Sequence, residues 1–118
     1  MNLINPSLTP AQQSAAARSA PTVQNSAPAS GATVVMTGGS ADAMVNLNPS
    51  GTLATLTVTL PDNATSQIGD IARIGSSKAV TLLTINGATS IIGGITSLIT
   101  NQIVSFKKTA DNTWMAIQ

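Results

Sequence analysis

The sequence predicts an all-β fold: a small β-sandwich or jelly-roll-like barrel of about seven or eight short antiparallel strands, preceded by an extended N-terminal arm. Hydrophobic residues make up 42% of the 118 residues, enough to bury a core. From residue 31 onward, β-branched runs alternate with Gly, Asn and Pro turns at a spacing of about 8 to 12 residues. Residues 1–30 instead hold four of the six prolines. We therefore expect an arm over 1–30 and a β domain over 31–118.

The predicted arm is rich in Pro, Ala and Ser. Proline removes a backbone donor and favours an extended chain, although a short helix over Ala11–Ala20, capped by Thr9, is an alternative. A segment with so few large apolar residues cannot order itself. We expect it to lie on a partner protein or a neighbouring subunit, through the contact residues Ile4, Pro6, Leu8 and Pro10.

The clearest strand is Leu53–Leu60, in which small and aliphatic residues alternate with threonines. A period of two places Ala54, Leu56, Val58 and Leu60 on one face of the strand. The same reasoning predicts further strands at Thr33–Met36, Ala43–Leu47, Ile68–Ile74, Ala79–Ile85, Thr89–Ile92, Gln102–Lys107 and Thr113–Ile117. Ile95–Ile99 is either another short strand or a turn, and we expect no helix within 31–118.

Two turn sequences predict hairpins. Asn86-Gly87 favours a type I′ turn between the strands on either side of it. Ala110-Asp111-Asn112 predicts a final hairpin at the C-terminal end. The short similarity between Gly31-Ala32-Thr33 and Gly87-Ala88-Thr89 is interpreted as chance or as a sequence common in β-turns, and not as an internal repeat.

The composition argues against an enzyme. The chain contains no His, Cys, Tyr or Glu, and only 8% of its residues are charged. A hydrolase triad cannot form without a base, and Ser76, Ser77 and Lys78 share a predicted turn, where adjacent residues rarely face each other. The sequence therefore predicts no catalytic residue, no cofactor and no metal site. An acid pair assembled at a subunit interface is the alternative left open, and the acids available are Asp42, Asp62, Asp70 and Asp111.

The charge and hydropathy patterns exclude two classes of partner. The net charge is +1 and the basic residues form no stripe, so we expect no nucleic-acid binding. The most apolar stretch, 85–99, is interrupted by Asn and Gly and is too short for a membrane helix. The N-terminus has no secretory pattern, so we expect synthesis in the cytoplasm of a host cell and no membrane partner.

Phe106 and Trp114 are the only aromatic residues. We interpret both as anchors of the core or of a subunit interface, because a large ring gains most by burial. The alternative for Trp114 is stacking on a sugar, which requires an exposed indole.

The C-terminal half resembles small β domains of phage virion proteins: tail-fibre and tailspike modules, capsid decoration proteins and head-fibre proteins. The similarity covers roughly residues 50–118 and runs through Gly69–Ile74, Ala79–Gly87, Gln102–Phe106 and Asn112–Gln118. In that pattern a Gly-Asp opens a strand, a Leu-Thr-Ile-Asn-Gly hairpin follows, and an Asn-x-Trp strand closes the domain. The resemblance implies a homotrimeric virion component with no catalytic residues.

A short arm and one β domain favour a capsid decoration (cement) protein over a tail fibre, which needs a long shaft. We therefore expect a structural protein on the capsid surface of the virion, with the major capsid protein and two further copies of itself as partners. The alternative is a receptor-binding head-fibre or tail-fibre module that adheres to host surface glycan. It would need an exposed Trp114 or a polar concave patch.

Overall fold

The computed structural model describes residues 20–117, and this part of the chain is all-β, as predicted. One 3-10 turn, η1 (Asn63–Thr65), interrupts the strands. The strands are β1 (Thr22–Ser26), β2 (Thr33–Val35), β3 (Asp42–Leu47), β4 (Leu53–Thr59), β5 (Ile71–Ser76), β6 (Val80–Asn86), β7 (Ser90–Ile92), β8 (Gln102–Ala110) and β9 (Thr113–Ile117).

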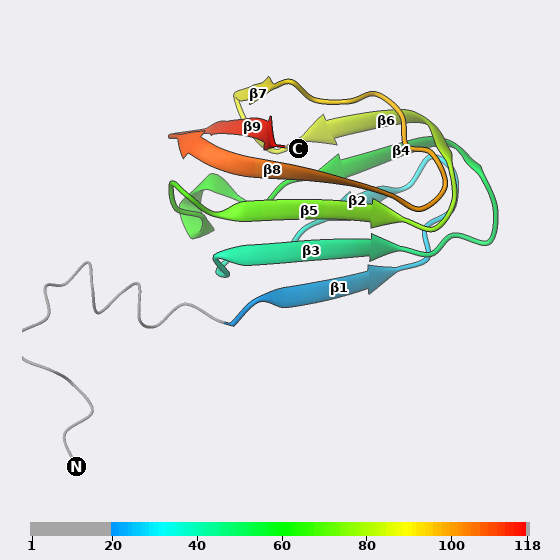
Figure 1. The fold of residues 1–118 in the computed structure, drawn as a ribbon, viewed down its shortest axis with the longest axis horizontal. Helices are drawn as coiled ribbons and strands as arrows, with labels where there is room; N and C mark the ends of the chain where they lie inside the picture. Colours follow the sequence, from blue (N-terminus) through cyan, green and yellow to red (C-terminus); the bar gives the residue numbers. More distant parts are fainter. Residues whose placement is uncertain (1–19, 118) are drawn as a thin grey trace, which may run out of the picture.

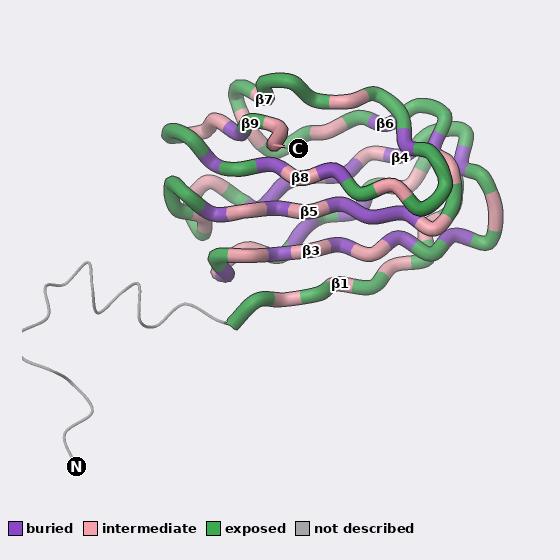
Figure 2. The backbone as a smooth tube through the Cα atoms, viewed as in Figure 1, coloured by how far each residue is buried: buried purple, intermediate pink, exposed green. Residues whose placement is uncertain are grey.

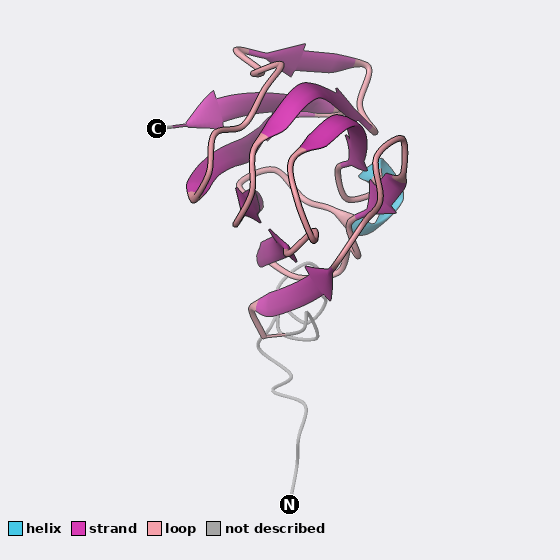
Figure 3. Cartoon of the chain, turned by 90° about the vertical axis from the view of Figure 1, so that its right-hand side faces the viewer, coloured by secondary structure: helices cyan, strands magenta, loops and turns pink. Residues whose placement is uncertain are grey.

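The strands form two sheets that face each other. The long sheet has the order β1-β3-β5-β8-β9-β7, and the short sheet has the order β2-β4-β6. From β1 to β6 the chain alternates between the two sheets, so that two successive strands, one in each sheet, make one coil. Each of β3 to β6 pairs in parallel with the strand of the same sheet in the preceding coil. Figure 1 shows β1, β3 and β5 side by side with the same direction, and Figure 3 shows the arrangement from the end toward which they point. The architecture is solenoid-like.

The prediction of an antiparallel sandwich or barrel is therefore wrong. The pairs β1–β3, β3–β5, β2–β4 and β4–β6 are parallel, which requires each strand to cross to the other sheet before the chain returns. Antiparallel pairing is found at the C-terminal end, where β8 pairs with β5 and with β9. The predicted final hairpin is thus confirmed as β8–β9.

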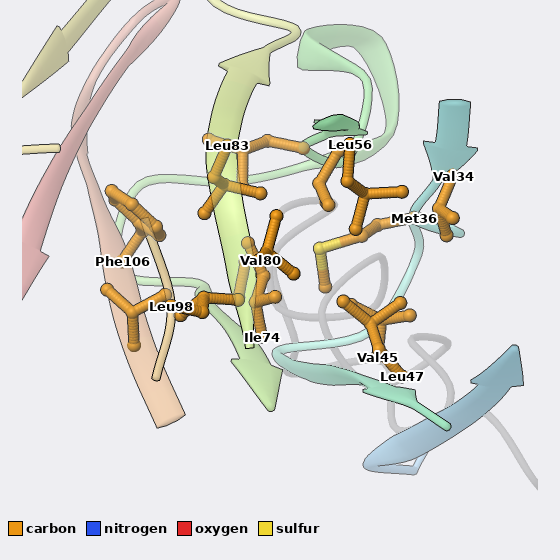
Figure 4. Packing of buried hydrophobic residues seen from close by; sticks show 14 of the residues in the cluster. Val34, Met36, Val45, Leu47, Leu56, Ile74, Val80, Leu83, Leu98 and Phe106 are labelled. Atoms are coloured by element: carbon orange, nitrogen blue, oxygen red, sulfur yellow. The ribbon is translucent and has the colours of Figure 1, made fainter. Parts of the chain in front are cut away.

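The core lies between the sheets and consists of aliphatic side chains stacked from coil to coil. Val45 pairs with Ile74 and Ile74 with Val104, while Leu56 pairs with Leu83 in the short sheet. All five are buried. Figure 4 shows side chains of both sheets directed toward one another in this cluster. Such stacking of similar residues stabilises parallel coils, because each added coil removes apolar surface from water.

The β structure begins at Thr22, inside the 1–30 segment that the sequence analysis assigned to the arm. β1 forms the edge of the long sheet and pairs with β3. Its alternate residues are half-buried and none is fully buried, as Figure 2 shows. An edge strand needs only backbone pairing on one side and a partly covered face, so a polar sequence suffices. The expected contact residues Ile4, Pro6, Leu8 and Pro10, and the expected helix except for Ala20, lie outside the described residues.

The predicted Asn86-Gly87 hairpin is also wrong. β6 and β7 do not pair with each other, because β7 pairs in parallel with β9. Gly87 has a φ of +102°, and a Cβ there would lie 2.8 Å from the carbonyl oxygen of Leu60. Glycine is needed at this position because the chain passes directly over the preceding coil.

Two smaller corrections concern which residues face the core. Ala54 is exposed and Leu53 is buried, because Ala54 and Thr55 both point outward and interrupt the alternation of β4. The alternation of β6 is interrupted in the same way at Thr81 and Leu82, which lie beside them in the sheet. The strand expected from Ile68 starts at Ile71, since Gly69 has a φ of +98° and turns the chain before it enters the sheet.

Candidate interaction face

The outward surface of the long sheet, called here the long-sheet face, presents three rows of side chains set by the strand register. The central row runs Val23, Met44, Arg73, Ser105 and Ile117. The flanking rows are Asn25, Asn46, Gly75 and Ile103 on one side, and Asp42, Ile71, Lys107, Met115 and Ile92 on the other. Each row crosses the sheet and joins residues distant in sequence.

Seven of the fourteen residues in these rows are aliphatic. Val23 is 64% exposed, Ile103 60%, Ile92 45% and Met115 39%. Three more, Met44, Ile71 and Ile117, are half-buried among them. Exposed aliphatic residues are ordinary when scattered, but a contiguous set on one sheet face marks an interaction surface.

Gly75 leaves room on the long-sheet face that two neighbouring side chains occupy. A Cβ on this residue would lie 3.1 Å from Met44 Cε and 3.4 Å from Ile103 Cγ1, so the two side chains fill the space that a side chain would take. One hollow of about 400 Å³ is lined by Arg73, Gln102, Ile103, Val104, Ser105 and Ile117. A second of about 200 Å³ adjoins it and shares Gln102 and Ile103. The long-sheet face therefore carries two adjoining hollows, each with polar and apolar lining residues.

One ion pair lies on this face. Arg73 Nε donates to Asp42 Oδ1 across 3.2 Å, from β5 to β3. The two side chains are 40% and 38% exposed, so the pair adds little stability, less than about 1 kcal/mol. It does neutralise the two charges in a face that is otherwise mostly uncharged.

The outward surface of the short sheet, called here the threonine face, is uncharged over the described strands. Thr33, Thr57 and Thr84 pair in one row that crosses all three strands. Val35, which is 59% exposed, pairs with Thr59, and Leu82, which is 51% exposed, pairs with Thr55. Removing water from an uncharged surface of hydroxyl and methyl groups costs less free energy than removing it from a charged surface.

The two predicted anchors, Phe106 and Trp114, are core residues of the single chain. Phe106 is 0% exposed and Trp114 is 1% exposed, and both belong to the central hydrophobic cluster. An indole so deeply buried cannot stack on a sugar. The structure thus places both aromatic rings away from any surface.

Each of the four aspartates has its own hydrogen-bond partner. Asp62 caps η1 by accepting from the Ala64 N–H, and Asp70 accepts from the Gln67 N–H across 2.8 Å. Asp42 pairs with Arg73, and Asp111 accepts from Asn63. Within residues 20–117, no group of three or more acids is placed to hold a metal ion. In the turn that holds the candidate Ser-Lys pair, the Ser77 hydroxyl donates to the carbonyl oxygen of Leu47 and the Lys78 side chain is exposed.

Sequence reasoning missed one polar cluster, built by Lys108 of β8 around η1. Lys108 is 3% exposed, and its Nζ contacts four oxygen atoms of Asn63 and Ser66. The signal was available, since alternation along β8 puts Val104, Phe106 and Lys108 on the same inward face. The charge of the lysine masked that signal.

Comparison with protein-family models, with curated proteins and with solved structures finds no significant match for this chain. In the part of the chain that the structure describes, no helix has the length and apolar character needed to cross a membrane. The function is therefore argued from the faces themselves.

Proposed function

We propose that this chain is a structural virion protein: a decoration (cement) protein that binds the outer surface of a phage head and stabilises it as a homotrimer. The partners are the major capsid protein and two further copies of the chain. No catalytic residue, cofactor or nucleic acid takes part. The resemblance of residues 50–118 to phage virion domains supports the assignment of this chain to a phage particle.

The single observation that carries the proposal is the aliphatic long-sheet face. Val23, Ile103 and Met115 stand in water in the isolated chain, and covering them would release free energy at about 25 cal/mol per Å² of apolar surface. The hollow lined by Arg73, Ile103 and Ile117 gives a neighbouring copy a place to insert a side chain. We assign this face to contacts between copies of the chain.

The uncharged threonine face supports the contact with the shell. It carries exposed Val35 and Leu82 among threonines, and it lies opposite the long-sheet face on the other side of the core. A trimer joined through one face therefore leaves the other available. Each contact to the shell is weak, but repeated contacts over a lattice act together as a multivalent attachment.

The test is to strip the protein from purified particles and to heat them with and without it. We expect stripped particles to release DNA at a lower temperature, and added pure protein to restore the original release temperature. Equal release temperatures for bare, native and restored particles would contradict a stabilising role.

The hollow lined by Arg73, Gln102 and Ser105 is the observation that keeps glycan binding as a second candidate. Guanidinium, amide and hydroxyl groups are typical donors for sugar hydroxyls. Binding on a glycan array that is lost in Arg73→Ala and Gln102→Ala variants would favour this second function.

A further inference from the structure

The cluster around Lys108 has the parts of a reaction site. Lys108 Nζ lies 2.6 Å from Asn63 Oδ1 and 2.8 Å from Ser66 Oγ. It also lies 3.2 Å and 3.4 Å from the carbonyl oxygens of Ser66 and Asn63. The amine is therefore held against the side-chain amide of a residue on η1, 45 positions away in sequence.

Two further groups hold the same amide from its other sides. The backbone N–H of Asn112 donates to Asn63 Oδ1 across 3.0 Å. Asn63 Nδ2 donates to Asp111 Oδ1 across 2.9 Å. Both groups come from the turn that joins β8 to β9, where Asn112 has a φ of +50°. The Asn63 amide is thus in direct contact with the nucleophile, with an N–H donor and with a carboxylate.

We propose that Lys108 and Asn63 condense into an intramolecular isopeptide bond. The ammonium of Lys108 first releases one proton to solvent; the resulting amine attacks Cγ of Asn63, and the Cγ–Nδ2 bond breaks. Nζ, which lies 2.6 Å from Oδ1, has to leave that oxygen and approach the adjacent carbon Cγ from one face of the amide plane. The Asn112 N–H stabilises the negative charge that develops on Oδ1.

Asp111 holds the leaving nitrogen. Its carboxylate accepts from Asn63 Nδ2 across 2.9 Å, and as the new bond forms Nζ passes a proton to Nδ2, which leaves as ammonia. In water the ammonia takes up the proton that the lysine ammonium first released. Overall, a lysine ammonium and an asparagine carboxamide become a secondary amide and an ammonium ion, and Asp111 is unchanged.

Burial favours this product. Lys108 is 3% exposed, and the four oxygens in contact with its Nζ are neutral carbonyl, amide and hydroxyl oxygens. The reaction replaces a buried ammonium by a neutral amide and sends the charge to water, where its solvation is better. The bond would tie the C-terminal hairpin to the turn that follows β4.

The test is intact mass spectrometry of the purified, folded chain, which is independent of the proposed function. We expect a mass lower by one ammonia, about 17 Da, than the sequence requires. After trypsin, the peptide that contains Asn63 should stay joined to the peptide that contains Lys108. A folded wild type with the full sequence mass would overturn the proposal.

Variants separate this bond from other losses of ammonia. Lys108→Arg should restore the full mass, while the matched control Lys107→Arg, on the exposed neighbouring position, should keep the deficit. Asp111→Asn should slow the loss, giving a mixture whose cross-linked fraction grows with time. A mass deficit without a branched peptide, as cyclisation of Asn86-Gly87 would give, would also overturn the proposal.

Discussion

Gln24 of β1 and Val35 of β2 join the two sheets across the N-terminal end of the solenoid. Gln24 Nε2 donates to the carbonyl oxygen of Val35 across 2.8 Å, and Gln24 Oε1 accepts from the Thr37 N–H across 3.2 Å. One side chain thus closes the first coil of the part of the chain that the structure describes, residues 20–117. Terminal coils of solenoids need such polar closure.

We therefore expect Gln24→Ala to lower the free energy of unfolding by about 1–2 kcal/mol, because two hydrogen bonds are lost. Amide hydrogen exchange in β1 and β2 should accelerate more than in β5. Gln67→Ala, in the exposed loop before β5, serves as the control. Equal stability of the two variants would show that the Gln24 bridge does not hold the first coil.

A second prediction concerns the close approach of two coils at Gly87. Gly87→Ala should lower the free energy of unfolding by at least about 2 kcal/mol, since a left-handed residue acquires a Cβ. That Cβ would also meet backbone atoms of Leu60. Gly51→Ala is the matched control, because no atom lies within 4 Å of its added Cβ. Denaturant titration measures both, and a Gly87→Ala variant as stable as the control would contradict the stacked coils.

A third prediction uses Trp114, the only tryptophan in the chain. Because it is 1% exposed, its fluorescence should peak at short wavelength in the folded protein and shift to longer wavelength on unfolding. Acrylamide should quench it weakly in the folded state and strongly in guanidinium. Strong quenching of the folded protein would place the indole at the surface and reopen sugar stacking.

A fourth prediction tests contacts between copies through the long-sheet face. Ile103→Asp should convert the proposed trimer into monomers, because a charge is placed in an apolar contact. Ile99→Asp is the matched control, since Ile99 is 70% exposed, lies in the loop before β8 and is not a member of the rows of that face. Sedimentation velocity distinguishes the two. Trimers that survive Ile103→Asp but not Ile99→Asp would move the interface elsewhere.

The sequence was sufficient to predict most strands, because alternation is the same physical signal in any sheet. Leu56, Val58 and Leu60 are buried as their spacing predicts. Strand pairing was not predictable in this way, since parallel and antiparallel partners need the same alternation. The coils also lack a fixed period: Thr33 pairs with Thr57 and Thr57 with Thr84, at spacings of 24 and 27 residues.

The interaction face and the lysine cluster depended on that missing pairing. Met44, Arg73 and Ser105 form one row only because β3, β5 and β8 are neighbours. Lys108 meets Asn63 for a similar reason, because β8 follows β5 in the sheet and ends beside η1. Contacts of this kind come from topology, which local sequence patterns do not contain.

The most direct measurement is a cryo-electron microscopy difference map between native particles and particles stripped of this protein. The proposal predicts threefold density of this chain's size on the outer surface of the head, with the long-sheet faces turned toward the threefold axis. Difference density confined to the tail, or no difference on the shell, would contradict a decoration role.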